Sequence, residues 1–270
     1  KAEAGQALVS SRIAEAARQS HRFEELEPVA VKGVAEPIEV CRLLARRQAP
    51  ARMGPRRDVA EMVGRSDERR LLAEQLQVLQ NGQDGGVIIV EGEAGIGKSR
   101  LLEDLLQQAE GPGITAYLGA ADAIEKNAAY HAWRAVFWDL FKLDGAEDAE
   151  PPGAGRLSPG QRARVMAHLE TAVPDKLKLA PLLNAVLPID LPDNELTAQL
   201  SGEVRGGNTQ ELLVALLADQ ARKTPLLMVL EDAHWLDSAY WALTRLASRE
   251  VEPMLLVIAT RPLPDPLPTE

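Results

Sequence analysis

The residues best suited to chemistry lie at positions 92–99, in the stretch GEAGIGKS. This stretch fits the pattern G-x-x-x-x-G-K-[ST] and lies between an apolar run and an amphipathic one, where a strand ends and a helix begins. Its glycines allow positive φ angles, which let successive backbone N–H groups converge on one anion. The positive end of the following helix points at the same place. The pattern predicts a phosphate-binding loop, called the phosphate loop below.

The side chains of the phosphate loop suit a nucleotide triphosphate with Mg²⁺. Lys98 would bring a mobile positive charge to the β- and γ-phosphates, and Ser99 would place its hydroxyl on the metal. A glycine-rich turn that only caps a helix is the alternative, and the flanking strand and helix patterns argue against it. We expect nucleotide contacts from Gly92, Glu93, Ala94, Gly95, Ile96, Gly97, Lys98, Ser99 and Arg100.

An acidic pair, Glu231 and Asp232, follows the apolar run LLMVL. The carboxyl ends of parallel strands meet at one edge of a sheet, so the pair would emerge beside the phosphate loop. One carboxylate would hold Mg²⁺, and the other would orient or deprotonate an attacking water. The division of roles stays open: Glu231 stands at the usual metal position, whereas aspartate is the commoner magnesium partner. Two solvated carboxylates at a strand end are the alternative.

Other candidates surround these two motifs. His234 and Trp235 would position the loop or sense the γ-phosphate, or else form a packed tryptophan beside a surface histidine. Asp237 is an expected N-cap of the next helix. Thr260 and Arg261 end the last strand and would project toward the γ-phosphate, where Arg261 would distinguish ATP from ADP or stabilise transition-state charge; an exposed strand-end arginine is the alternative.

The segment MVGR, at positions 62–65, precedes the first helix of this region. Backbone and apolar atoms of Val63, Gly64 and Arg65 would hold an adenine ring. Four residues are a short signal on their own.

Alternating strand and helix patterns from position 62 onward would position these residues. The pattern predicts an α/β fold with a mostly parallel sheet flanked by helices. The expected strands cover 86–92, 114–120, 225–232 and 253–262, and the expected helices cover 66–82, 98–111, 128–143, 209–222 and 238–249. The first strand is an uninterrupted β-branched run, typical of a strand covered on both faces. Ser66 is the expected N-cap of the first helix, and Asn81-Gly82 its end.

Residues 145–207 are Pro/Gly-rich and acidic, with short helical pieces such as GQRARVMAHLE. We expect an insertion that lies over the active-site side of the domain. The division of the chain is therefore 1–45, a small α+β segment; 46–61, an Arg/Pro-rich linker; and 62–270, the α/β domain.

The first segment combines a helical pattern, SSRIAEAARQ, with two short strands in VAVKGVAEPIEVCRLL. The strands flank a turn marked by glycine and proline. The second strand is amphipathic and has no evident pairing partner in the sequence.

Composition narrows the function classes. The net charge of −10 argues against wholesale nucleic-acid binding, with the linker RRQAPARMGPRR as a basic exception. No apolar run approaches the ~20 residues needed to cross a bilayer, and there is no signal-peptide pattern. Cys41 is the only cysteine, so neither a disulfide framework nor a zinc ribbon is available. We expect a cytoplasmic protein.

Four stretches together resemble the P-loop ATPase module of AAA/STAND-class signalling NTPases: VGRSDERRLL, VEGEAGIGKSRLL, VLEDAHWLDSAYWAL and LLVIATRP. The closer resemblance is to ATPases linked to bacterial adenylate/guanylate cyclases, relatives of soluble adenylyl cyclase. It implies ATP and Mg²⁺ as cofactors, with the carboxylates of Glu231 and Asp232 acting at the metal and the attacking water. It also implies adenine contact near Val63–Arg65 and γ-phosphate sensing by Arg261. A complete core of this type continues into a fifth strand and a helical lid, so we expect the domain to be C-terminally incomplete.

The front of the chain is similar to the last segment of a class III nucleotide cyclase domain. In that family a lysine before a glycine reaches the substrate triphosphate, and Lys32-Gly33 stands at the matching place. The family's metal-binding aspartates belong to earlier segments, so we predict no cyclase activity for this chain. The resemblance implies an attached cyclase domain upstream and helical domains downstream. A switch set by ATP or ADP would in addition self-associate in a way that depends on nucleotide.

Three functions remain open from the sequence. The first is an ATP-hydrolysing regulatory module of a multidomain cyclase. The second is a switch that binds ATP or ADP without hydrolysis, and the third is the ATPase module of a transcriptional regulator. The signal sensed and the preference for ATP over GTP do not follow from the residues.

Overall fold

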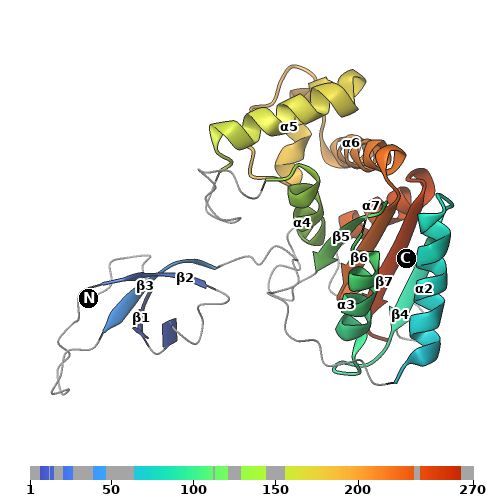
Figure 1. The fold of residues 1–270 in the computed structure, drawn as a ribbon. Helices are drawn as coiled ribbons and strands as arrows, with labels where there is room; N and C mark the ends of the chain where they lie inside the picture. The colour runs from blue at the N-terminus through green and yellow to red at the C-terminus, as the bar shows by residue number, and fades with distance from the viewer. Residues whose placement is uncertain are drawn as a thin grey trace.

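The computed structural model describes residues 7–11, 13–14, 21–26, 39–46, 64–111, 113–120, 129–143, 156–233 and 238–262. From residue 64 onward the chain alternates between strands and helices, as its pattern predicts (Figure 1). The elements are α2 (Ser66–Gln80), β4 (Gly86–Glu91), α3 (Lys98–Ala109), β5 (Thr115–Ala120), α4 (His131–Leu140), α5 (Pro159–Ala172), η1 (Pro174–Ala185), η2 (Thr197–Gln199), α6 (Gly202–Lys223), β6 (Leu226–Glu231), α7 (Ser238–Glu250) and β7 (Met254–Thr260).

The four long strands form one parallel sheet in the order β4-β7-β6-β5. The α/β fold with a parallel sheet flanked by helices is therefore confirmed. The helix after β4 and the helix after β6 pack on opposite faces of this sheet. After β4 and after β6 the chain therefore turns toward opposite faces at the carboxyl edge of the sheet. Open α/β sheets bind ligands at such a place.

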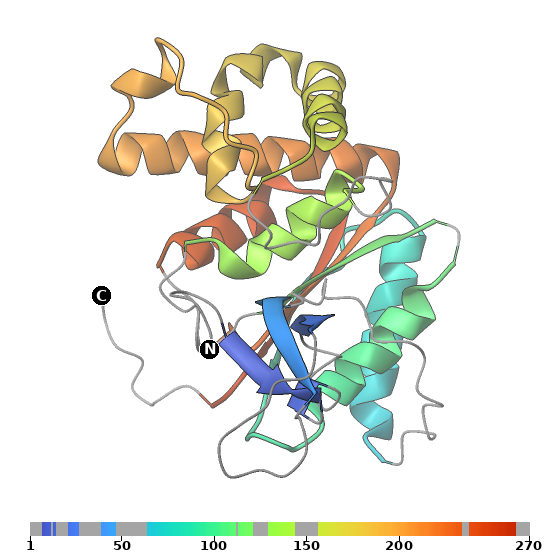
Figure 2. The same ribbon diagram turned by 90° about the vertical axis from the view of Figure 1, so that its left-hand side faces the viewer.

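Each face of the sheet has its own hydrophobic core. Leucines of α2 and α3, spaced three or four residues apart, pack on Leu227, Val229, Leu255 and Val257. On the other face α4, α6 and α7 cover Met228, Leu230, Leu256 and Ile258. Figure 2 shows the helices in layers on the two sides of the sheet. Both faces of β6 and β7 are therefore buried, which explains their continuous apolar sequences.

The expectation that the first strand is covered on both faces is wrong. Ile88 and Val90 pack against the core with α2 and α3, but Val87 is 49% and Ile89 is 62% exposed. β4 lies at the sheet edge, and its register partners on β7, Leu256 and Ile258, are buried. The helices that cover β7 on this face do not extend over β4. A β-branched run thus specifies a strand but not how many of its faces are covered.

The segment predicted as an insertion, 145–207, is largely helical where it is described. Its last part, 202–207, belongs to α6, which begins at Gly202. The expected location is wrong. His168 of α5 lies near Asp219 and Lys223 at the end of α6 that leads into the start of β6. Figures 1 and 2 both place α5 at the end of the molecule away from the turn between β4 and α3.

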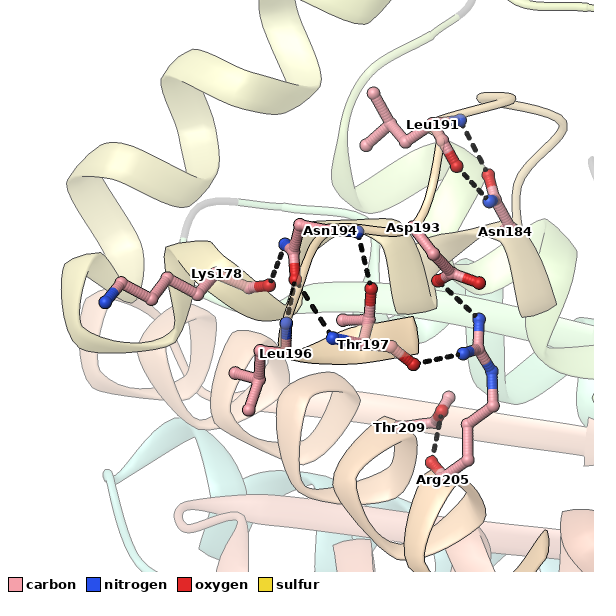
Figure 3. A network of polar contacts seen from close by, with 9 residues as sticks. All are labelled: Lys178, Asn184, Leu191, Asp193, Asn194, Leu196, Thr197, Arg205 and Thr209. Carbon is pink, nitrogen blue, oxygen red and sulfur yellow. Dashed lines mark hydrogen bonds and ion pairs between the residues drawn. The ribbon is translucent and has the colours of Figure 1, made fainter. Parts of the chain in front are cut away.

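Polar side chains fix this helical segment. Asn194 accepts hydrogen bonds from the backbone N–H groups of Leu196 and Thr197 and donates to the carbonyl of Lys178 (Figure 3). Arg205 of α6 donates to the carbonyl of Thr197 at 2.8 Å and to Asp193 at 2.9 Å. The backbone of this irregular stretch has carbonyls and N–H groups that need hydrogen-bond partners. Side chains supply partners for these groups.

A second sheet forms near the start of the chain, with β3 (Val40–Arg46) between β1 (Ala7–Ser10) and β2 (His21–Glu25). Both pairings are antiparallel. β3 is the amphipathic strand for which the sequence offered no partner, and it has two. The predicted strand before it, the linker after Arg46 and Lys32-Gly33 lie outside the described residues, as does most of the predicted helix at 10–19. Arg46, the first residue of the predicted linker, is the last residue of β3. Among the helices that the structure describes, none is long and apolar enough to cross a membrane.

Candidate functional site

The phosphate loop joins β4 to α3 at the carboxyl edge of the sheet, as predicted. Gly95 and Gly97 adopt φ angles of 78° and 97°, which a side chain would disfavour. No hydrogen bond among the described residues uses the N–H groups of these two glycines. The Lys98 ammonium group lies across the loop and donates to the carbonyls of Gly92 at 2.7 Å and Glu93 at 3.0 Å. The loop thus combines unused donors with a nearby cation, the chemistry that an anion needs.

The acidic pair ends β6, two strands away from β4 in the sheet. Strand alternation places Glu231 on the same face as Leu227 and Val229, toward α3. There its carboxylate receives a hydrogen bond from Ser99. The structure therefore brings together the Ser99 hydroxyl and one of the two carboxylates that the sequence offered as metal ligands.

The charged neighbours that shift the pKa of Glu231 are both carboxylates. Burial raises the pKa of its carboxyl group, and the nearby carboxylates of Asp232 and Glu103 raise this pKa further, while the Ser99 hydrogen bond lowers it. A divalent cation would offset this repulsion, so the donor set fits Mg²⁺. In this arrangement Ser99 and Glu231 would hold the ion. Asp232, also predicted as a metal ligand, follows the strand in a different conformation.

Asp232 is exposed and has a φ angle of 53°, in the left-handed region that non-glycine residues seldom adopt. The backbone turns sharply here, so Asp232 does not continue the alternation of β6. Adjacent residues of the pair thereby face different surroundings. Such strained backbone conformations occur often at functional sites.

The end of β7 lies directly beside the phosphate loop. The N–H of Gly92 donates to the carbonyl of Thr260 at 3.2 Å, and Arg261, which is exposed, follows at once. The Thr260 side chain is buried on the face of Ile258, opposite to the Glu231 face, and its hydroxyl has no hydrogen-bond partner among the described residues. Arg261 directly follows β7, and its predicted contact with the γ-phosphate stays a prediction, whereas the Thr260 side chain belongs to the other side of the sheet.

The segment before α2 also reaches the loop. Arg65, with φ 55°, is the N-cap residue of α2, and Ser66 is already helical, so the predicted cap is one residue late. The Arg65 side chain donates to the carbonyl of Ile96 at 2.8 Å. Gly64 is exposed beside it, with φ 83°. Val63, the third residue predicted at the adenine, lies outside the described residues, as do His234, Trp235 and Asp237.

Two features escaped sequence reasoning, one within the site and one beside it, between α2 and α3. Glu103, one helical turn after Ser99, lies near enough to Glu231 to raise its pKa, and the spacing of four residues in KSRLLE could have revealed it. Arg69 of α2 forms a bidentate pair with Asp104 of α3, at 2.9 and 3.0 Å. Their partnership joins segments far apart in sequence, and no local pattern indicates it.

Comparison with known proteins gives a relative and a family that match this chain. An uncharacterized protein of Rhizobium meliloti (strain 1021) is 24% identical over 263 residues, which are 94% of this chain and 24% of that protein. The chain thus spans about a quarter of the length of this relative. The AAA ATPase domain family matches residues 61–258, from just before α2 to within β7. The chain therefore belongs to the family of AAA ATPase domains.

Proposed function

We propose that this chain is a Mg·ATP-binding and ATP-hydrolysing module. The observation that carries the proposal is the meeting of Ser99 and Glu231 at the mouth of a loop with unused N–H donors. Family membership supports nucleotide binding in general. The choice of ATP, and of hydrolysis over binding alone, is our proposal.

Binding would begin with an exchange of partners at Lys98. Its ammonium group would leave the carbonyls of Gly92 and Glu93 for the β- and γ-phosphates, which are stronger acceptors because they are charged. The N–H groups of the loop and the start of α3 would hold the remaining phosphate oxygens. Backbone atoms at Gly64 and Arg65 would contact the adenine ring.

For hydrolysis we assign the two carboxylates different tasks. Ser99 and Glu231 would hold Mg²⁺, which supplies charge neutralisation at the phosphates. Asp232, exposed and turned away from the strand direction, would orient the attacking water and accept its proton. Arg261, beside the loop, would contact the γ-phosphate and stabilise charge as the terminal bond breaks.

A phosphate-release assay with titration calorimetry tests this proposal. We expect ATP binding, slow release of phosphate and a loss of turnover in Asp232→Asn with ATP affinity retained. Tight ATP binding without any phosphate release would instead favour the second candidate, a switch that responds to ATP and ADP without hydrolysis. Release that is unchanged in Asp232→Asn would contradict the role given to this carboxylate.

We also propose a regulatory context: the module belongs to a multidomain signalling protein with a class III cyclase domain before it. The likeness of residues 1–45 to the end of such a domain supports this, and residues 1–45, 46–61 and 62–270 would be cyclase end, linker and ATPase. The alternative context is a transcriptional regulator. Assaying cyclase activity of the longer parent protein with and without Lys98→Ala tests the proposal, which fails if cyclic nucleotide production is absent.

A further inference from the structure

Arg65 connects the segment before α2 to the phosphate loop through two fixed contacts. One guanidinium nitrogen donates to the carbonyl of Ile96 at 2.8 Å, and another pairs with Glu68 at 3.2 Å in the first turn of α2. The side chain is 29% exposed. Two anchors orient the planar guanidinium group more strictly than one would. Arg65 itself has a φ angle of 55°, in the left-handed region that non-glycine residues seldom adopt.

This contact determines how one peptide of the loop is oriented. In a planar trans peptide the C=O and N–H groups point in opposite directions. Arg65 holds the Ile96 carbonyl on its own side, so the N–H of Gly97 points to the other side of the loop. That N–H has no hydrogen-bond partner among the described residues. It stands directly before α3, where the helix end adds its own positive potential.

We infer that Arg65 is a positioning residue for the phosphate end of the nucleotide. It fixes the peptide between Ile96 and Gly97, so that the Gly97 N–H is preorganised for a phosphate oxygen. Its position in the sequence suggested a contact with adenine, whereas its side-chain hydrogen bonds lead to the loop instead. The inference rests on the proposed nucleotide binding, and it assigns to this side chain a role in triphosphate affinity.

The chain offers a matched control one helical turn away. Arg69 lies on α2 and, like Arg65, forms charged hydrogen bonds, but its partner is Asp104 on α3. Asp104 in turn accepts from Gln108, at 2.7 Å. Removing Arg69 therefore weakens the attachment of α2 to α3 without removing a hydrogen bond to the phosphate loop.

The test compares two ligands that share phosphates but not a base. A fluorescent ATP analogue is displaced from the protein by Mg·ATP and by Mg·tripolyphosphate. Arg65→Ala is expected to weaken both ligands by the same factor, about tenfold, the effect of one charge-assisted hydrogen bond. Arg65→Lys should restore part of the loss for both, since an ammonium group can still donate to the Ile96 carbonyl. Arg69→Ala should lower the melting temperature and leave both affinities within about twofold.

Three results would overturn the inference. Arg65→Ala could weaken ATP alone, which would mean an adenine contact, or it could change neither affinity. Arg69→Ala could weaken both ligands as much as Arg65→Ala does, which would mean a general brace between helices. Wild-type protein that binds neither ligand would be a separate result, because it overturns the proposed function itself and the inference with it.

Discussion

Glu231 and Asp232 are neighbours in sequence but face different surroundings. Glu231 continues the strand and meets Ser99, and Asp232 follows in a left-handed conformation and is exposed. The sequence could not divide their roles, because strand-end carboxylates are equivalent until the backbone direction is known. The geometry supports Glu231 as the metal ligand, and this assignment has a measurable consequence.

Magnesium dependence separates the two roles. Glu231→Gln keeps the shape but removes the charge, so we expect it to need about tenfold more Mg²⁺ for half-maximal nucleotide binding or turnover, the change that corresponds to about 1.4 kcal/mol. Asp232→Asn should lower the turnover number at an unchanged Mg²⁺ requirement. Titrating Mg²⁺ at fixed ATP measures both. The assignment is wrong if Asp232→Asn raises the Mg²⁺ requirement and Glu231→Gln does not.

His168 gives a second test at the residue scale, in the pH dependence of stability. Burial lowers the pKa of this imidazole below its ordinary value of 6.5; the charges of Lys223 and Lys142 lower the pKa further, and Asp219 opposes them. The rings of His168 and Phe141 meet in a T-shaped contact, with 5.2 Å between their centroids. Folding therefore favours neutral His168, and its surroundings disfavour a proton.

Because the folded pKa is the lower one, the unfolded chain takes up this proton first as the pH falls below 6.5. The contribution of His168 to stability is complete above 6.5 and decreases between 6.5 and the lower folded pKa. Urea unfolding at about pH 7.5 and about pH 5.5 should show a larger loss for wild-type protein than for His168→Leu. Equal losses in the two proteins would contradict the proposed burial of a neutral imidazole.

At the scale of elements, α4 lies unusually close to β5. A Cβ atom placed on Gly119 of β5 would lie 2.7 Å from the carbonyl oxygen of Ala132 and 3.0 Å from a methyl group of Leu230. The backbone oxygen cannot withdraw without moving the helix. Gly119 is thus required by packing, a reason that no turn or loop signal in the sequence discloses.

A pair of glycine substitutions tests this packing. Gly119→Ala should destabilise the fold by about 1–3 kcal/mol, as overpacking does in cores. Gly206→Ala is the control, because Gly206 lies inside α6 with open space around it. There alanine should stabilise by about 0.5–1 kcal/mol through its higher helix propensity. Thermal unfolding measures both, and a neutral Gly119→Ala would show that α4 can move away from β5.

The elements around the site were predictable because their sequences carry strong periodic signals. The four strands and the helix with GKS at its start follow from apolar runs and leucine spacing. The exposed face of β4 was not predictable, because Val87 and Ile89 are residue types typical of a buried strand. They are exposed because none of the helices that the structure describes packs on that face of β4. The Arg65 contact with Ile96 was equally hidden, because 31 residues separate the partners.

At the scale of the whole molecule, the helical segment around η1 and η2 lies away from the phosphate loop (Figure 1). Its sequence, rich in proline and glycine, suggested a cover for the site. Instead its polar side chains bind its own backbone, with Asn194 as the most connected of those in Figure 3. Stability and nucleotide affinity should therefore respond separately to changes in this segment.

Asn194→Ala tests that separation. The variant leaves the N–H groups of Leu196 and Thr197 and the carbonyl of Lys178 without their side-chain partner. We expect a loss of about 1–2 kcal/mol in the free energy of unfolding, with ATP affinity unchanged within about twofold. Urea unfolding and calorimetry on the same preparation measure the two quantities. A large loss of ATP affinity in a folded variant would mean that this segment contributes to the nucleotide site.

The central claim is that the phosphate loop binds Mg·ATP, and Lys98 tests it most directly. Calorimetric titration with Mg·ATP is compared for wild-type protein, Lys98→Ala and the control Lys178→Ala, whose exposed side chain lies on η1. The account predicts saturable binding to wild-type protein and to Lys178→Ala, and at least a hundredfold weaker binding to Lys98→Ala, about 2.7 kcal/mol. Equal binding of Mg·ATP to wild-type protein and to folded Lys98→Ala would contradict it.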